Sequence, residues 1–509
     1  MHARLYLDHT HDHYTNLDVL NGRVQLQIPN PVNVTSIVVK LEGEARTRLM
    51  TAIKPSRTDK QRPVLEVHKF LYKTQVVWPA GMQQDELLTN TKQAFPLDAG
   101  KHEYPFQFKL PLNMGCQQQN SLSTNVSFSN MIPEYGKNPT QHVKTTLPPS
   151  LSGFPGEAEI RYFVKVTVNR PEFYKENPRD MANFTFLPIE PPRPAQTDGE
   201  AYARRSHQFL EGPPGSSGGK KGFFGHKDPT APDVNPNHSP RVSVDARLPN
   251  PAILTINQAL PLKILVKNMG ERSKNIYLQM LQIELIGYTK VRAHEVTRTE
   301  SNSWLLASMS NMAIPIGSPT DAVGTEVPIN QEYWSDKLIP NTVAPSFQAC
   351  NLSRSYEIEV RVGLGYGSYN HGEDQLVVLP LRLPVKLYSG IAPPQALLEA
   401  SSTGGTPTAA AAGKPNFMQQ PYIGSNLRPQ QPNAGPTMAT SPSQGKTGAD
   451  PFPPQGAAGT QQEAVPEDAP PSYEEAVGAN LPPINGYRGS YMPPPVPEGA
   501  PRFSEDRKR

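Results

Sequence analysis

The 509-residue chain has few cysteines, little net charge and no long apolar run. Its two cysteines, Cys116 and Cys350, are too few to build a disulfide framework or a cysteine-based zinc site, and this favours a reducing compartment. The formal net charge is only +3, so the chain as a whole has no electrostatic attraction for nucleic acid. We therefore expect no metal, no cofactor and no nucleic-acid partner.

A secretory signal and a membrane-spanning helix are also missing from the sequence. Residues 1–14 are polar and rich in His and Asp, whereas a signal is basic and then apolar, so we expect a cytoplasmic protein. A spanning helix needs about 20 mostly apolar residues, but even Ala252–Val266 is interrupted by polar residues and a proline. We expect any membrane contact to be peripheral.

Helical periodicity is scarce before residue 390, which disfavours the strand-and-helix folds of many enzymes. The chain instead alternates apolar and polar residues, most clearly over Glu159–Val168 and Tyr356–Leu364, as a half-buried strand requires. Such segments fall into two groups. We therefore predict an all-β protein with one antiparallel β-sandwich over residues 1–190 and a second over residues 241–390.

Two other segments have a composition that does not suit strands. Residues 191–240 are dense in Pro, Gly, Ser and charge, which is typical of a linker or insertion. Residues 391–509 contain 22 prolines among 119 residues and have almost no β-branched runs. Because such a segment buries too little apolar surface to offset its ordering entropy, we predict a disordered proline-rich tail.

Three stretches carry a resemblance to a known family. Leu97–Pro111 looks like the glycine-aromatic-proline signature of the N-terminal domain of α-arrestins, the arrestin relatives best represented in fungi. Arg161–Val168, followed by Arg170-Pro171, looks like the strand and exit that close that domain. Ile339–Tyr356 resembles the equivalent part of the C-terminal domain. The resemblance covers nearly the whole of residues 1–390.

The resemblance implies two arrestin-like sandwiches of about seven or eight strands each, joined by a linker and without a catalytic centre. Cargo recognition is implied on the concave faces and edge loops. The resemblance further implies an adaptor that links plasma-membrane transporters or receptors to a HECT-class ubiquitin ligase, so that this cargo is ubiquitylated and endocytosed. We accordingly expect a cytoplasmic protein, recruited to the plasma membrane and endosomes, that is not an enzyme.

The sharpest motif of the tail is Pro470-Pro471-Ser472-Tyr473, a PPxY sequence of the kind that WW domains bind. The two prolines favour a polyproline II turn that fits the aromatic groove of a WW domain, and the tyrosine fills the next pocket. A tail this rich in proline produces such a match by accident about one time in eight. The family resemblance favours the functional interpretation, so we predict that Pro470, Pro471 and Tyr473 bind the WW-domain ligase.

His9, His11 and His13 recur with a period of two, which on a strand would direct them to one side and suggest a metal site. A hydrolase that uses such a motif needs a barrel of alternating strands and helices and further ligands. The sequence supplies no such alternation. We therefore predict a solvated hairpin here that holds no catalytic metal.

Residues 191–240 contain two weaker candidate sites. Lys220 and Lys221 lie among exposed aromatic residues and are candidate ubiquitin acceptors, although the same stretch also suits contact with anionic lipid or a plain soluble loop. Arg204-Arg205-Ser206 resembles a basophilic kinase site, with Ser206 as the candidate phosphate acceptor, but short sites of this type are frequent by chance.

Two alternatives to the ligase adaptor stay open. A receptor-coupled signalling scaffold of the arrestin type would use the ligase contact only secondarily, and a clathrin-binding box in the tail would favour it, but residues 391–509 contain none. A sandwich-fold hydrolase or lectin would need convergent acids or histidines on one sheet face, which sequence alone does not place.

Overall fold

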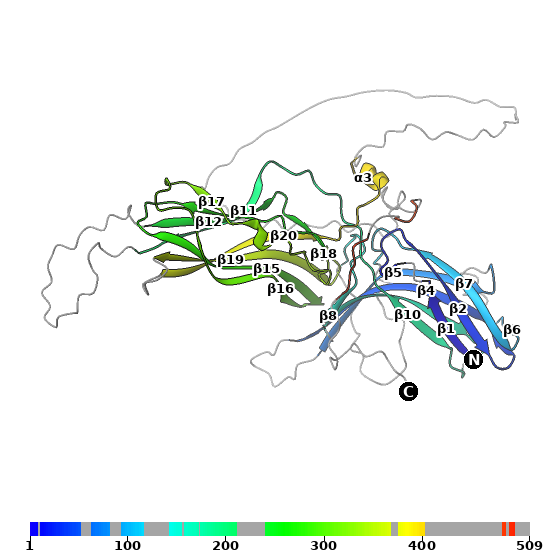
Figure 1. Cartoon of the computed structure of the whole chain (residues 1–509). Coiled ribbons are helices and arrows are strands. Elements are labelled where there is room, and N and C mark those ends of the chain that lie inside the picture. Colours follow the sequence, from blue (N-terminus) through cyan, green and yellow to red (C-terminus); the bar gives the residue numbers. More distant parts are fainter. Residues whose placement is uncertain are drawn as a thin grey trace, which may run out of the picture. The chain divides into compact units, whose positions relative to one another are not determined.

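The computed structural model describes residues 1–8, 11–51, 63–81, 93–116, 142–154, 157–172, 174–210, 240–367, 375–402, 481–484 and 488–493. Almost all the regular structure in these ranges is β-strand, in two groups of mainly antiparallel sheets (Figure 1), which confirms the predicted all-β, arrestin-like architecture. Both groups belong to one compact unit, which also includes the described tail residues up to Ser401, 481–484 and 488–493. Within the described residues, no helix is both long enough and apolar enough to span a membrane.

The first group of strands forms the N-terminal sandwich. Within the described residues its sheets have the strand orders β1-β2-β7, β10-β9-β4-β5 with β8 beside β9, and β3-β6, and every pair is antiparallel. The strands are β1 (His2–Leu7), β2 (Val19–Ile28), β3 (Val32–Val34), β4 (Ser36–Met50), β5 (Pro63–Trp78), β6 (Phe95–Leu97), β7 (Gly100–Lys109), β8 (Leu151–Phe154), β9 (Ala158–Asn169) and β10 (Arg179–Phe184).

The second group forms the C-terminal sandwich. Its described sheets have the orders β11-β12-β14-β17 and β13-β20-β19-β15-β16, with β18 beside β19, and the short pair β13-β20 is parallel. The strands are β11 (Glu200–Gln208), β12 (Arg241–Pro249), β13 (Ile253–Thr255), β14 (Lys263–Asn268), β15 (Asn275–Ala293), β16 (Val296–Pro315), β17 (Glu326–Pro328), β18 (Phe347–Gln348), β19 (Leu352–Gly367) and β20 (Gln375–Tyr388). A 3-10 turn, η2 (Gln331–Tyr333), and a helix, α3 (Gln395–Ser402), complete the regular elements.

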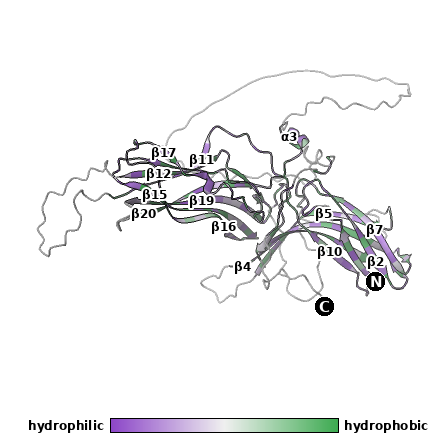
Figure 2. Cartoon of the chain, in the orientation of Figure 1, coloured by the Kyte–Doolittle hydropathy of each residue, from purple (hydrophilic) through white to green (hydrophobic). Residues whose placement is uncertain are grey.

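Alternation of side chains explains why these segments form strands. Along β9 the apolar residues from Ile160 to Val168 are buried, while Arg161, Lys165 and Thr167 between them are half-buried. Hydrophobic and hydrophilic bands alternate in the same way along strands of both sandwiches (Figure 2). Since successive side chains point to opposite faces of a sheet, each sheet presents one apolar face to its core.

One strand lies where the sequence suggested a linker. Within residues 191–240, Glu200–Gln208 forms β11, which pairs with β12 at the edge of the four-stranded sheet. Arg204 on β11 makes two hydrogen bonds of 2.7 Å each to the carboxylate of Asp245 on β12. Backbone pairing and this ion pair hold β11 at the edge of the sheet, so the strand does not depend on a buried apolar face. Its sequence therefore has no clear apolar alternation, and periodicity did not reveal it.

Some residues of the predicted disordered tail are packed. Ile391, Leu397 on α3 and Tyr491 are buried in the hydrophobic core. The described tail residues 481–484 and 488–493 also form contacts with both sandwiches, and these contacts are described below. A composition averaged over 119 residues conceals short anchoring stretches of this kind.

A close approach of backbone to side chain fixes Gly22 on β2. A Cβ atom there would lie 2.5 Å from the Tyr6 carbonyl oxygen on β1 and 2.5 Å from a ring carbon of Phe106 on β7. We expect Gly22→Ala to lower the free energy of unfolding by about 1–3 kcal/mol, because the strand pairs on both sides must shift. Denaturant unfolding of the full chain measures this. Gly199→Ala, where the added Cβ meets only ordinary contacts, is the control, and equal stability of the two variants would contradict the prediction.

Candidate functional site

A turn before β2 presents a fixed carboxylate at the end of the N-terminal sandwich. The backbone N–H of Thr15 donates to Asp18 Oδ2 over 2.8 Å. The N–H of Leu110, which follows β7, donates to the Asp18 carbonyl oxygen over 2.9 Å. Leu17 has a positive φ of 70°, and its N–H donates to the Leu110 carbonyl oxygen. The turn is thus bound to β7, and the Asp18 carboxylate has a defined direction.

The tail reaches this carboxylate through Arg488. The two Arg488 Nη atoms donate to the two carboxylate oxygens of Asp18 over 2.6 and 2.7 Å, which is the bidentate geometry that arginine and carboxylate prefer. Arg488 Nη2 also donates to the carbonyl oxygen of Ile484 over 2.8 Å. Only 7% of the Arg488 side chain and 5% of the Asp18 side chain are exposed. Removing one partner of a pair buried this deeply costs about 3–5 kcal/mol, because the other charge is left buried, whereas a surface ion pair contributes about 0–1 kcal/mol.

Tyr491 anchors the same tail stretch by burying an aromatic ring. The side chain is 3% exposed, and its hydroxyl donates to the carbonyl oxygen of Ser150 over 2.6 Å. Burial, and then the neighbouring Tyr356 of the C-terminal sandwich, raises the pKa of Tyr491, so the phenol stays neutral and donates. The ring therefore contributes apolar burial and one satisfied hydrogen bond.

Polar contacts bind the tail to the C-terminal sandwich as well. Asn257 Nδ2 donates to the Ser490 carbonyl oxygen over 3.0 Å, and Asn341 Nδ2 donates to Ser490 Oγ over 2.9 Å. The N–H of Met492 donates to the Asn341 carbonyl oxygen over 3.1 Å. At the other end, Lys109 Nζ of the N-terminal sandwich donates to the Leu481 carbonyl oxygen over 2.5 Å. Residues 481–484 and 488–493, which we name the tail anchor, therefore bind both sandwiches.

The two sandwiches also meet directly around Glu66 of β5. Glu66 Oε1 lies 3.0 Å from Arg292 Nη2, and the backbone N–H of His294 donates to Glu66 Oε2, both from the β15–β16 hairpin. Thr47 on β4 donates to the Arg292 carbonyl oxygen over 2.6 Å, and Asn351 Nδ2 donates to Thr47 Oγ1 over 3.1 Å. Polar groups of one sandwich thus complete the hydrogen bonding of the other.

Glu66 carries its charge in a buried place. Burial by itself would raise the pKa of Glu66, but the hydrogen bonds from His68 and the His294 N–H, together with the Arg292 charge, lower it below its usual value. Burial by itself would lower the pKa of His68, but its hydrogen bonds to Cys350 and Glu66 raise it. The carboxylate is therefore ionised and serves as the centre of the contact.

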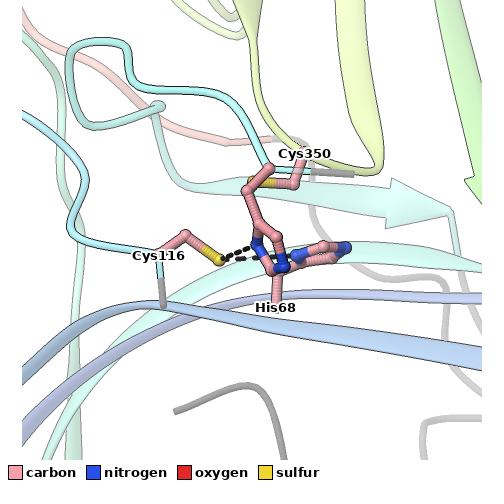
Figure 3. A group of neighbouring side chains, drawn as sticks. His68, Cys116 and Cys350 are labelled. Atoms are coloured by element: carbon pink, nitrogen blue, oxygen red, sulfur yellow. Dashed lines mark hydrogen bonds between the residues drawn. The ribbon is translucent and has the colours of Figure 1, made fainter. Parts of the chain in front are cut away.

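His68 also belongs to a group of four side chains with metal-binding atoms. His68 Nδ1 lies 3.4 Å from Cys116 Sγ, and Cys116 Sγ lies 3.2 Å from His142 Nδ1. Cys350 completes the group, and the four ligand atoms lie within 4.8 Å of one another. Figure 3 shows His68, Cys116 and Cys350 directed toward one another. Two cysteines are too few for a cysteine-based zinc site, and the spacing of the residues along the chain gives no sign that two histidines join them.

The structure places only some of the residues that the sequence singled out. His9, Lys220, Lys221, Pro470, Pro471 and Tyr473 lie outside the described residues. Ser206 is exposed on β11, and the neighbouring Arg204 is engaged with Asp245. Phosphorylation of Ser206 by a kinase therefore stays a prediction.

His13 differs from the predicted solvated hairpin, whereas His11 does not. His11 is exposed, but His13 is 3% exposed, and its carbonyl oxygen accepts a 3.4 Å hydrogen bond from Arg488. Burial, and then the Arg488 charge, lowers the pKa of His13, so its ring is neutral. His13 is covered because it lies next to the Asp18 turn, which the tail anchor contacts, and sequence spacing gives no signal of a contact across 475 residues.

The comparison with protein families agrees with the fold of the N-terminal sandwich. Residues 3–128 match the family model described as "Arrestin (or S-antigen), N-terminal domain". No curated protein matches the chain. The matched span lies within the N-terminal sandwich, so the match and the strand topology together indicate an arrestin-type domain. Arrestin-family proteins are generally non-catalytic adaptors and scaffolds, and this is the class of protein that the fold and the match support.

Removing the charge of Arg488 tests the tail anchor. Arg488→Gln leaves the Asp18 carboxylate buried without its partner, a change that costs about 3–5 kcal/mol for a buried pair. We expect the Met492 amide, which donates to Asn341, to exchange with solvent about a hundred-fold faster or more. Hydrogen-exchange mass spectrometry of the tail measures this. Lys101→Gln breaks the ion pair with Glu103, whose side chains are 60% and 46% exposed, and should leave the exchange unchanged. Exchange in Arg488→Gln at the wild-type rate would show that the pair does not hold the tail.

Proposed function

We propose that this protein is a non-catalytic adaptor that recruits a WW-domain HECT ubiquitin ligase to membrane transporter or receptor cargo, so that the cargo is ubiquitylated and internalised. The observation that carries this proposal is the PPxY sequence 470–473, in a chain whose N-terminal sandwich matches the arrestin family model. A polyproline turn followed by tyrosine has the chemistry that WW domains recognise. The sandwiches then provide the cargo-binding part of the adaptor.

The position of the motif relative to the tail anchor supports the proposal. Tyr473 precedes Leu481, whose carbonyl oxygen is bound by Lys109, by eight residues. Eight residues span at most about 28 Å when fully extended. A ligase bound to Tyr473 would therefore stay within a short reach of the N-terminal sandwich and of any cargo on it. Such a short connection keeps the effective concentration of the ligase at the cargo high.

The same proposal accounts for where the protein acts and what is modified. The adaptor works in the cytoplasm and is recruited to the plasma membrane and endosomes by its cargo, with peripheral membrane contact. Ubiquitin is transferred to lysines of the cargo and of the adaptor itself. Lys220 and Lys221 are the candidate acceptors on the adaptor. A receptor-coupled signalling scaffold is the alternative, in which the ligase contact is secondary.

Tyr473→Ala is the direct test of the motif. An aromatic anchor of a small interface contributes about 2 kcal/mol or more, so we expect the affinity for the ligase WW domains to fall roughly thirty-fold or further. Tyr473 lies outside the tail anchor, so the thermal stability of the sandwiches should stay the same. Binding is measured by titration calorimetry with the full chain, and cargo ubiquitylation and uptake are measured in cells.

Tyr422→Ala is the matched control, because it removes a tail tyrosine that follows a single proline. It should change neither WW-domain binding nor uptake. Wild-type binding and uptake in Tyr473→Ala would show that the PPxY match is accidental. Lost WW-domain binding with normal cargo ubiquitylation and uptake would favour the scaffold.

A further inference from the structure

Four side chains from distant parts of the chain bring two sulfur and two imidazole ligands to one place. His68 lies on β5, Cys116 follows β7, and His142 precedes β8, all in the N-terminal sandwich. Cys350 lies in the turn between β18 and β19 of the C-terminal sandwich. His68 and Cys350 are buried, and Cys116 is half-buried. Two thiols and two imidazoles form one of the common ligand sets of structural zinc.

The spacing of these atoms matches a tetrahedral site. With Zn–S distances of about 2.3 Å and Zn–N distances of about 2.0 Å, sulfur and nitrogen ligands lie about 3.5 Å apart at tetrahedral angles. The ring nitrogens lie at similar distances from Cys116 Sγ, 3.4 Å for His68 Nδ1 and 3.2 Å for His142 Nδ1. Little movement is needed for one ion to bind all four atoms, because all lie within 4.8 Å of one another.

A second observation concerns the far side of the His68 ring. His68 Nε2 lies 2.6 Å from Glu66 Oε1, and Nδ1 faces Cys116. In the neutral tautomer with the ring proton on Nε2, that proton points to the carboxylate and the Nδ1 lone pair is available to an ion. A carboxylate that orients the distant nitrogen is the usual companion of a metal-bound histidine. Glu66 itself is held by Arg292 and by the His294 N–H. The orientation of His68 is thus set by residues outside the four-ligand group.

Other contacts hold the remaining ligands in position. The N–H of Gly115 donates to the Phe70 carbonyl oxygen over 2.8 Å, which fixes the chain beside Cys116 to β5. Arg292 Nη2 donates to the Cys350 carbonyl oxygen over 2.6 Å. Thr145 Oγ1, three residues after His142, donates to the Gln348 carbonyl oxygen of β18 over 2.8 Å. The loops that carry the ligands are therefore bound to one another without any ion.

We propose that His68, Cys116, His142 and Cys350 bind one structural Zn²⁺ ion that joins the two sandwiches. Both thiols lose their protons to solvent on binding, so the two thiolates balance the charge of the ion. Four protein ligands leave no open position, which is typical of a structural and not a catalytic zinc.

A disulfide between Cys116 and Cys350 is the competing state of the two sulfur atoms. It would use neither His142 Nδ1 nor the orientation of His68 by Glu66. Zinc uses both imidazoles and both sulfurs, and mixed thiolate and imidazole ligands in a tetrahedron are typical of zinc. The geometry therefore favours the ion.

The experiment measures zinc in the full-length chain. The protein is purified without chelator or affinity metal and analysed by inductively coupled plasma mass spectrometry, and we expect about one zinc per chain. Exchange with Co²⁺ should produce the visible absorption of tetrahedral cobalt together with thiolate-to-cobalt charge transfer. Removal of zinc by a chelator should lower the midpoint of thermal unfolding, and added Zn²⁺ should restore it.

Variants identify the ligands. Cys350→Ser and His142→Ala should each lose most of the zinc, and the partly exposed His142 offers a substitution that leaves the core packing intact. The combined change of His9, His11 and His13 to alanine is the matched control, since it removes three histidines outside the four-ligand group, and it should keep the full zinc content. Circular dichroism shows whether each variant is folded.

Any of three results would overturn the proposal. The first is wild-type protein, purified under reducing conditions, that contains no zinc and gives no thiolate-to-cobalt absorption with added Co²⁺. The second is zinc that persists in His142→Ala and Cys350→Ser but is lost when His9, His11 and His13 are changed. A Cys116–Cys350 disulfide found by mass spectrometry in protein from reducing cytosol would count against the ion in the same way. These measurements do not depend on the ligase, so they stand apart from the test of Tyr473.

Discussion

A single buried carboxylate, Glu66, organises the place where the two sandwiches meet. Its oxygens contact Arg292 and the His294 N–H of the C-terminal sandwich and the His68 ring of its own sandwich. Taking this charge out of water is costly, and the surrounding donors compensate for the cost only when both sandwiches are in position. The carboxylate thus makes the contact specific in geometry, because a shifted sandwich would leave a buried charge without partners. The orientation of His68, and with it the four-ligand group, depends on the same residue.

The tail anchor uses a second buried charge in a comparable way. The backbone of its own turn holds Asp18, and Arg488 of the tail donates to both carboxylate oxygens. Tyr491 adds apolar burial next to this pair. Electrostatics therefore selects the register of the tail on the sandwiches, while the aromatic ring supplies the burial that opposes the entropy of ordering it. The two sandwiches share the task, because Asn257 and Asn341 hold the stretch on the other side.

The alternation of apolar and polar residues predicted the two-sandwich fold from the sequence. It could not predict the polar contacts between residues far apart in the chain. β9 and β19 could be predicted because each buries an alternating set of apolar residues. β11 was not, because an edge strand held by Arg204 and Asp245 has no apolar signal. The group around His68 was missed for a different reason, since its members are separated by up to 282 positions, from His68 to Cys350, and only folding brings them together. The pairing of Arg488 with Asp18 was hidden in the same way, in a tail whose average composition is that of a disordered chain.

The tail anchor attaches the C-terminal part of the chain to the sandwiches by non-covalent contacts. The chain is attached on both sides of the interval 403–480, because Leu397 on α3 is buried in the core and the carbonyl oxygen of Leu481 accepts a hydrogen bond from Lys109. The backbone is therefore held on both sides of this interval. A single backbone cut anywhere along it would divide the polypeptide into two pieces that remain together under native conditions, held by Asp18, Ser150 and the two asparagines. The smaller piece would carry its part of the chain as a bound peptide, and it would leave only when the buried arginine and tyrosine were withdrawn. A nicked molecule would thus keep its native mass in solution while it runs as two fragments in denaturant.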